Sequence, residues 1–344
     1  MVSITSPLLK WYDAHARELP WRNPPKKSKP SDPAWPYRVW LSEVMLQQTT
    51  VEAVKPYFLK FTERWPSVDD LAAASDDEVM AAWAGLGYYS RARNLVKCAR
   101  EVVALGGFPK GEVQLRELPG LGAYTAAAIS AIAFGRRAVV VDANVERVVS
   151  RLFNITEPLP KSRKAIREAT ETITPGARAG DFAQAMMDLG SSICTSKSPR
   201  CLLCPIREVC EGQKAGEPER LPVKPAKKAK PERRGTAFWI ERDKHVWLVT
   251  RRGTGMLGGM RGLPDDGWTA REDGSDKLPL PGDWEELGAV RHTFTHAHLT
   301  LSLKRMSAEA EPDGEGVWWP IDQIENAGLP TLFAKAARLA LAAD

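Results

Sequence analysis

The sequence predicts two unlike domains, an all-α domain followed by a smaller mixed α/β domain. Apolar residues recur at helical spacing through the first two-thirds of the chain, a basic, proline-rich stretch follows, and strand-like alternation then begins. The length of 344 residues and the hydrophobic content of 43% are those of a globular protein with about two domains.

Helical patterns fill the first domain, which we place at residues 1–213. Ser75 to Glu78 has the form of a capping box, and a further helix opens at Ser90. The most apolar stretch, Leu121 to Phe134, is about 14 residues long, whereas a membrane span needs about 20. We therefore expect a buried helix there and no membrane partner. Other helical patterns run at about 38–49, 52–64, 122–134, 143–153, 162–173 and 180–193.

A linker is predicted at residues 214–234, where eight basic residues and four prolines leave too little apolar surface to pack a core. Beyond it, residues 235–344 form the predicted mixed domain. Two strands surround a turn near Asp243, a third strand alternates through residues 298–306, and a helix is expected from Thr331 to Ala342.

Charge is distributed unevenly along the chain. Basic residues outnumber acidic ones by 28 to 23 over residues 1–213 and by 8 to 3 in the linker, whereas residues 235–344 hold 12 against 17. A basic front part and connector suit a nucleic acid partner, although a solvated surface would give the same counts. The N-terminus lacks a basic start followed by an apolar core, so we expect a cytoplasmic, nucleoid-associated monomer.

Four of the five cysteines lie in one short run, Cys194-x6-Cys201-x2-Cys204-x5-Cys210. Four thiolates so close together can hold one metal centre, and disulfides are the weaker alternative in a cytoplasmic chain. Zinc usually takes paired CxxC units, and this run has only one, so an iron–sulfur cluster is favoured over zinc. The fifth, Cys98, lies on an apolar helical stripe and is expected to fill core space.

A glycine-rich hairpin, LPGLGAYTA, leads into the apolar helix. Gly120 and Gly122 let backbone N–H groups converge near a helix N-terminus, where a phosphate can bind without a charged side chain. The sequence therefore indicates contact with a nucleic acid backbone at this hairpin.

Two carboxylates suggest acid chemistry. Helical spacing places Glu43 with Val39 and Leu46, and an apolar face raises a carboxyl pKa so that the group can hold a proton near neutrality. Asp142 precedes a helix, whose N-terminus favours a negative charge. One protonated and one charged acid form the pair that glycosidic cleavage uses. From spacing alone, a surface glutamate and a helix cap are the leading alternatives.

The motifs LSEVMLQQTTV, GLGYYSRARNL, LPGLGAYTAAAI, VDANVERVVSRL and the four-cysteine run occur in this order. Together they resemble the MutY family of adenine DNA glycosylases, within the helix-hairpin-helix superfamily. The resemblance continues through RHTFTH and WWPIDQIENAGLP near the C-terminus, and it covers most of the chain outside the linker and residues 23–35. It implies a helix-hairpin-helix glycosylase domain with a 4Fe-4S cluster on the four cysteines, and a Nudix-like C-terminal domain.

The resemblance also implies roles for named residues. Glu43 would protonate the N7 atom of a flipped adenine paired with 8-oxoguanine or guanine, and Asp142 would stabilise or bond the sugar cation. Tyr124 and Asn144 match the positions that support this cation. Endonuclease III-like relatives carry a Schiff-base lysine where Tyr124 stands, so the resemblance implies base removal without strand cleavage.

Further matches concern DNA contacts. Gln48 and Tyr88 resemble residues that wedge into the duplex, although core or helix-surface filling is the alternative. Thr295 and His296 match the family's 8-oxoguanine recognition loop, with threonine where serine is usual. The Nudix metal-binding pattern is missing, so the C-terminal domain is expected to recognise rather than hydrolyse. The lysine- and proline-rich insertion at residues 23–35 is a departure from the family.

Two other function classes remain open. An endonuclease III-like lyase is opposed by Tyr124 and by the C-terminal domain. A non-catalytic DNA-damage sensor is opposed by the presence of both Glu43 and Asp142.

Overall fold

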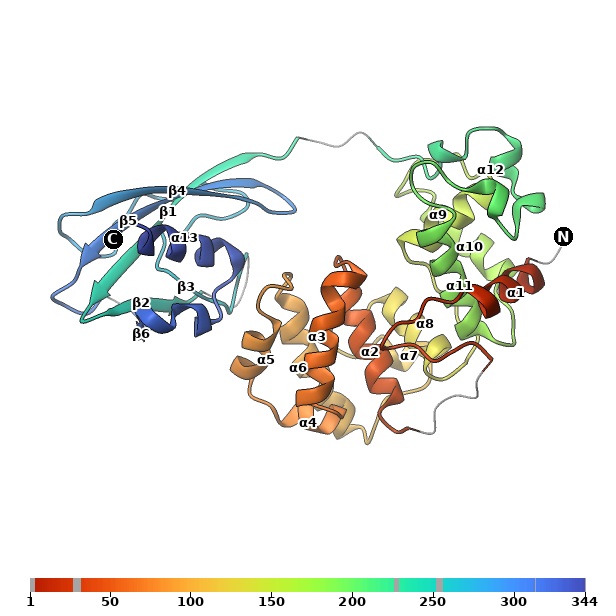
Figure 1. Cartoon of the computed structure of the whole chain (residues 1–344), viewed down its shortest axis with the longest axis horizontal. Coiled ribbons are helices and arrows are strands. Elements are labelled where there is room, and N and C mark those ends of the chain that lie inside the picture. The colour runs from red at the N-terminus through yellow and green to blue at the C-terminus, as the bar shows by residue number, and fades with distance from the viewer. Residues whose placement is uncertain (1–3, 27–31, 226–228, 252–255, 313, 344) are drawn as a thin grey trace. The chain divides into compact units, whose positions relative to one another are not determined.

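A computed structural model describes residues 4–26, 32–225, 229–251, 256–312 and 314–343 (Figure 1). The described residues form two compact units, one drawn from Met1–Ala74 with Asn94–Lys227 and the other from Ser75–Arg93 with Lys228–Asp344. Residues 75–93, which the sequence places in the first domain, thus group with the second unit. The domain boundaries at residues 213 and 234 remain a prediction, and the insertion at 23–35 lies partly outside the described residues.

The first unit is helical, as predicted. Its elements are α1 (Thr5–His15), α2 (Trp35–Leu46), α3 (Val51–Arg64), α4 (Val68–Ala73), most of α6 (Ser90–Ala104), α7 (Glu112–Leu115), α8 (Ala123–Ile132), α9 (Ala143–Leu152), α10 (Arg163–Ile173), α11 (Ala179–Ser192) and α12 (Glu211–Lys214), with short 3-10 turns η1 (Cys201–Leu203), η2 (Arg207–Val209) and η3 (Pro218–Arg220). The helix expected at 38–49 begins and ends three residues earlier. No helix in the described part of the chain is long and apolar enough to cross a bilayer.

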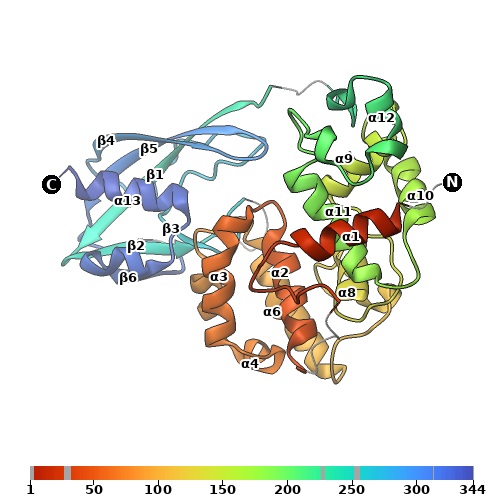
Figure 2. The same cartoon turned by 45° about the vertical axis from the view of Figure 1, so that its right-hand side comes forward.

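The core of this unit lies where α11 packs against α1, α8 and α9 (Figure 2). The apolar stretch predicted to be a buried helix is α8, whose residues Thr125 to Ala131 are all buried. Helices α8 and α11 approach each other closely at Gly180 of α11, where an added Cβ would lie 2.6 Å from the Ala131 carbonyl oxygen. A glycine is therefore required for the close contact between α8 and α11, which both contribute walls to the cavity described below.

The described ends of the predicted linker, residues 214–225 and 229–234, belong to the two units. Leu221 is 5% exposed, contrary to our expectation that residues 214–234 pack no core. Its carbonyl accepts a hydrogen bond of 3.1 Å from Arg151 Nε, and Val223 O accepts one of 2.9 Å from Leu159 N. The first strand of the second unit already begins at Glu232. The sequence did not predict these contacts, because backbone carbonyls make most of them. Composition indicates only where apolar side chains could pack.

The second unit contains one mixed sheet. Its elements are α5 (Asp76–Trp83), β1 (Glu232–Arg242), β2 (His245–Thr250), β3 (Arg261–Gly262), β4 (Glu285–Thr293), β5 (His298–Ser307), β6 (Gly316–Pro320), η4 (Ile321–Ala327) and α13 (Thr331–Leu341). The strand order is β3-β2-β1-β5-β4, with β6 paired to β2, and only β1 and β5 run parallel. The capping box of Ser75 and Glu78 before α5 and the turn at Asp243 are both confirmed.

Strand β1 is buried on both sides of the sheet. Ala237 and Trp239 pack beneath α13, which lies along one face of the sheet (Figure 1), while Phe238 and Ile240 pack into a second cluster. Because side chains of a strand alternate between faces, a strand covered on both sides is apolar at consecutive positions. This accounts for the apolar run AFWI, which does not alternate.

We predict that Gly180→Val destabilises the protein by about 2 kcal/mol or more, because its side chain would press on the backbone of α8. The matched control is Gly176→Val, since a Cβ at Gly176 has no heavy atom within 4 Å. Urea unfolding followed by helical circular dichroism measures both. Equal unfolding midpoints for the two variants would contradict the packing argument.

Candidate functional site

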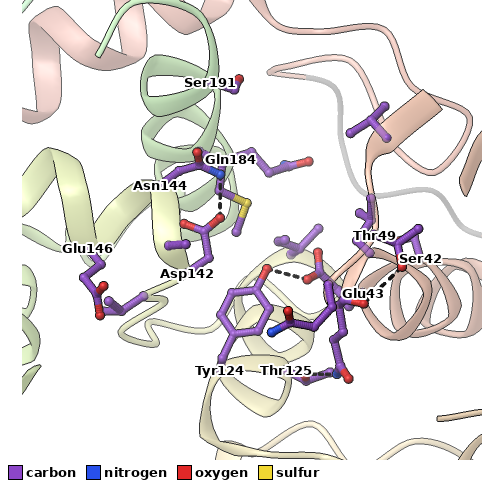
Figure 3. Close-up of a pocket in the computed structure, with 18 of the residues that line it drawn as sticks. Ser42, Glu43, Thr49, Tyr124, Thr125, Asp142, Asn144, Glu146, Gln184 and Ser191 are labelled. Carbon is purple, nitrogen blue, oxygen red and sulfur yellow. Dashed lines mark hydrogen bonds between the residues drawn. The ribbon is translucent and has the colours of Figure 1, made fainter. Parts of the chain in front are cut away.

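A cavity of about 1290 Å³ opens in the first unit and is lined by α2, the start of α8, the start of α9 and α11 (Figure 3). Pockets that hold small ligands measure roughly 300–1,000 Å³, so this cavity can take a nucleotide together with flanking atoms. Seven of the residues singled out from the sequence line it: Glu43, Gln48, Gly120, Gly122, Tyr124, Asp142 and Asn144.

Glu43 lies on α2 and is 6% exposed. Its Oε2 atom accepts a hydrogen bond of 2.6 Å from the Tyr124 hydroxyl (Figure 3). Burial raises the pKa of Glu43 to about 7; the Tyr124 hydrogen bond lowers it, the Asp142 carboxylate raises it, and the Arg22 cation lowers it. The apolar neighbours predicted this direction. A carboxyl group with this pKa can deliver a proton near neutrality.

Tyr124 is held beside Glu43 by the contact between α2 and α8. Gln47, directly after α2, donates from Nε2 to Thr125 Oγ1 over 3.0 Å. Burial, with the nearby Glu43 carboxylate, raises the pKa of Tyr124 well above its ordinary value. The phenol therefore stays protonated and remains a hydrogen-bond donor to Glu43.

Asp142 is both the cap of α9 and a lining residue of the cavity, so the two readings of the sequence are compatible. Its Oδ1 atom accepts from Val145 N at 2.7 Å, and its Oδ2 atom accepts from Asn144 Nδ2 at 2.8 Å. Both bonds fix the orientation of the carboxyl group at the N-terminus of α9. Asp142 thus presents a fixed carboxylate to the cavity.

Asn144 is fixed in turn by α11. Arg147 Nη2 donates to Asn144 Oδ1 at 2.9 Å and to Gly190 O at 2.6 Å. A Cβ at Gly190 would lie 2.6 Å from the Cβ of Asn144, so a side chain at residue 190 would displace the asparagine. The orientation of the Asp142 carboxylate, to which Asn144 donates, therefore depends on the absence of a side chain at residue 190 of α11.

Gly120 and Gly122 of the hairpin suit glycine for different reasons. Gly120 has a φ of +78°, and a Cβ there would lie 2.8 Å from the Asn94 side chain. At Gly122 nothing lies within 4 Å of the Cβ position, and Gly122 and Ala123 are exposed. The start of α8 is thus exposed and has no side-chain cap, which suits an approaching phosphate.

Gln48 and Tyr88 share an unusual backbone. Their φ angles are 58° and 50°, in the left-handed region that residues with a Cβ rarely adopt. Gln48 is exposed and Tyr88 is 45% exposed. Core filling, one of the two alternatives for these residues, does not fit this exposure, whereas filling of a helix surface does. Strained and exposed side chains of this kind are typical of ligand-contacting positions.

Thr295 and His296 lie exposed between β4 and β5 in the second unit. The hydroxyls of Thr295 and Tyr88, which belong to the same unit, are 2.9 Å apart. Phe294 beside them packs on Trp268, with ring centroids 5.9 Å apart, and its carbonyl accepts from Lys230 Nζ at 2.8 Å. The loop is therefore anchored through Phe294 and Thr295, while His296 is exposed to solvent.

Acidic residues of the second unit form ion pairs within it. Asp265 pairs with Arg251, and Glu285 pairs with Arg305 at 2.8 Å. His298 Nδ1 lies 2.9 Å from Thr293 Oγ1 at the start of β5.

The four cysteines Cys194, Cys201, Cys204 and Cys210 line one small cavity with Arg151. Arg151 is 1% exposed, and its Nη1 atom lies 3.3 Å from Cys194 Sγ. Burial raises the pKa of the Cys204 thiol to about 12, so its thiolate form needs a bound cation. Among the described histidine, cysteine, aspartate and glutamate side chains, no three are grouped as a metal-ion site.

Sequence reasoning missed three polar residues at the wall of the large cavity. Arg22 and Gln184 line it, and Asp188 is buried directly behind. Gln184 and Asp188 are four residues apart in the apolar helix α11, and polar residues at buried helical positions are the signal that could have identified them.

Comparisons with known proteins find similar sequences and folds over both parts of the chain. A family model described as "HhH-GPD superfamily base excision DNA repair protein" matches residues 41–175, and a NUDIX domain model matches residues 236–339. The chain is 34% identical to the adenine DNA glycosylase of Homo sapiens, over 96% of this chain and 73% of that protein. It is 33% identical to the enzyme of the same name from Buchnera aphidicola subsp. Baizongia pistaciae, over 95% and 94%. A solved thermostable thymine-DNA glycosylase is 30% identical and aligns with a TM-score of 0.53 over 61% of this chain and 94% of that one.

We predict that Glu43→Gln stabilises the protein at alkaline pH. A carboxyl whose folded pKa is raised from 4.5 to about 7 costs folding nothing below pH 4.5 and progressively more as the pH rises to about 7. Above that, removing the ionisable group should add up to about 3 kcal/mol. Urea unfolding across this pH range measures the difference, with the exposed Glu63→Gln as control. A stabilisation that does not grow with pH would contradict the burial argument.

Proposed function

The chain belongs to the adenine DNA glycosylase family, and from this premise we propose that it removes adenine paired with 8-oxoguanine or guanine from double-stranded DNA. The observation that carries the proposal is the buried Glu43 beside the fixed carboxylate of Asp142 in one cavity. A base inside a duplex is out of reach of such a cavity, so the adenine nucleotide must rotate out of the stack at a cost of a few kcal/mol.

In the proposed reaction Glu43 donates its proton to N7 of adenine. The bond between the sugar C1′ and the base breaks, and its electron pair leaves with the protonated base, so adenine departs as a neutral molecule. Asp142 faces the positive charge that develops on the sugar and stabilises it or bonds to it transiently. Water supplies the hydroxyl group to C1′, its remaining proton restores Glu43, and an abasic site is left.

Tyr124 and Asn144 support the two acids. The Tyr124 hydroxyl donates to Glu43 over 2.6 Å, and Asn144 donates to Asp142 over 2.8 Å. A phenol cannot form the Schiff base through which a lysine would lead to strand cleavage. The proposal is therefore a glycosylase that removes the base and leaves the strand intact.

DNA contacts are proposed on both units. Gly120 and Gly122 bring the N-terminus of α8 to a phosphate, and Gln48 and Tyr88 fill the gap in the stack. Thr295 and His296 read the 8-oxoguanine opposite the adenine. The exposure of these four side chains supports the assignment.

A 4Fe-4S cluster on Cys194, Cys201, Cys204 and Cys210 is part of the proposal. The four cysteines surround one cavity, and the buried Arg151 cation beside Cys194 offsets thiolate charge. When bound, the cluster fixes the loop between α11 and α12. We further propose that the enzyme works as a cytoplasmic monomer on the chromosome.

Single-turnover cleavage of a duplex with one adenine opposite 8-oxoguanine tests the reaction. Strand breaks should form only after alkali treatment, and Glu43→Gln should lower the rate at least about a hundredfold because it removes the general acid. A duplex with guanine in place of 8-oxoguanine measures the preference. Borohydride trapping of a DNA adduct would indicate a lyase instead, and no adenine release would favour a damage sensor.

Metal analysis and visible absorption test the cluster. We expect about four irons per chain and little zinc in the wild type, and loss of iron in Cys204→Ser. The control is Cys98→Ser, since Cys98 is buried away from the cluster loop and is 0% exposed. One zinc and no iron per chain in the wild type would contradict the cluster proposal.

A further inference from the structure

Asp188 is the most enclosed carboxylate behind the large cavity. It lies on α11, is 1% exposed and holds two arginines. Its Oδ1 atom accepts from Arg17 Nε at 2.6 Å, and its Oδ2 atom accepts from Arg22 Nη1 at 2.7 Å and from the Arg17 backbone N–H at 3.1 Å. These three hydrogen bonds hold the Asp188 carboxylate and both arginine side chains in place.

Arg22 belongs to two charge systems. Its side chain is 8% exposed, and it lines the cavity that contains Glu43. The charges of Arg22 and Glu43 act on one another, since the Arg22 cation lowers the pKa of Glu43. Among the described hydrogen bonds, however, Arg22 donates to Asp188, and the donor to Glu43 is Tyr124.

We propose that Asp188 is a positioning residue that keeps the Arg22 guanidinium from pairing with Glu43, so that the catalytic acid can remain protonated. A buried arginine next to a carboxyl group normally forms an ion pair with it and ionises it. An acid held in such a pair could not donate a proton. Asp188 prevents this by giving Arg22 a nearer and better-satisfied partner.

The other groups near Arg22 cannot replace Asp188. Tyr12 on α1 faces both residues, but burial raises its pKa to about 12, so it stays neutral. Its hydroxyl is buried without a hydrogen-bond partner in the described part of the chain. Asp142 is occupied by Val145 and Asn144, and Tyr124 is a neutral donor. Glu43 is therefore the carboxyl group that remains for Arg22 in the cavity if Asp188 loses its charge, since its charge already acts on Arg22.

The inference rests on the proposed function, but its test does not require a substrate. Carbon-13 NMR of glutamate-labelled full-length protein follows the titration of the Glu43 carboxyl, which is assigned by its absence in Glu43→Gln. In Asp188→Asn we expect the pKa of Glu43 to fall by about 1 pH unit or more, because Arg22 turns to it. The single-turnover rate near pH 8 should fall about tenfold with it.

A second substitution separates this role from loss of structure. In Asp188→Asn with Arg22→Met, the pKa of Glu43 should return to the wild-type value or above it, because the cation that lowers it is gone. The control is Asp13→Asn, which neutralises a carboxylate on α1 that pairs with Lys26 at 3.0 Å and with Arg178. It should leave the pKa of Glu43 unchanged.

An unchanged or raised Glu43 pKa in Asp188→Asn would overturn the inference. So would a lowered value that persists without Arg22. If the wild type releases no adenine while the NMR shifts occur as expected, the proposed function fails and the charge arrangement stands.

Discussion

The arrangement of the site depends on the burial of one carboxyl group, that of Glu43. Placing an ionisable group in an apolar wall is costly unless it stays neutral or finds partners. Here the neighbours are balanced: the Tyr124 hydroxyl and the Arg22 cation favour the charged form, and burial and Asp142 oppose it. Glu43 lies on α2, Tyr124 lies on α8, and Asp142 caps α9. Gly180 and Gly190 let α11 pack closely beside them, since each lets α11 approach a backbone or side chain that a Cβ would meet.

The residues of the site could be predicted where their chemical role is accompanied by a recognisable pattern in the local sequence. Glu43 among apolar neighbours, Asp142 before a helix and glycines before another helix are local patterns, and the cavity contains all of them. Arg22 and Asp188 could not be predicted from a local pattern, because their role depends on a contact between residues 166 apart in the chain. The capping function of Asp142 also illustrates that a structural and a chemical role can share one carboxylate.

The fold was predictable to the extent that each element has a solvent side and a core side. The helices of the first unit and strands β1, β2 and β5 follow that rule or are wholly apolar. Strand β4 does not: most of its residues are at least partly exposed, it lies at the edge of the sheet, and a register shift at Gly288 interrupts its pairing. Strand β6 is short and half-buried. Edge strands of this kind depend on a partner strand for their existence, and a single sequence does not reveal the partner.

The left-handed backbone of Gln48 and Tyr88 has a consequence for how this protein can change over generations. A residue with a Cβ in that region gives up about 1 kcal/mol that glycine would recover. Two stabilising substitutions are thus within a few nucleotide changes at all times. Each of them would relieve the backbone and remove the side chain that the proposed DNA contact uses. At these two positions greater stability and the proposed function therefore require different residues.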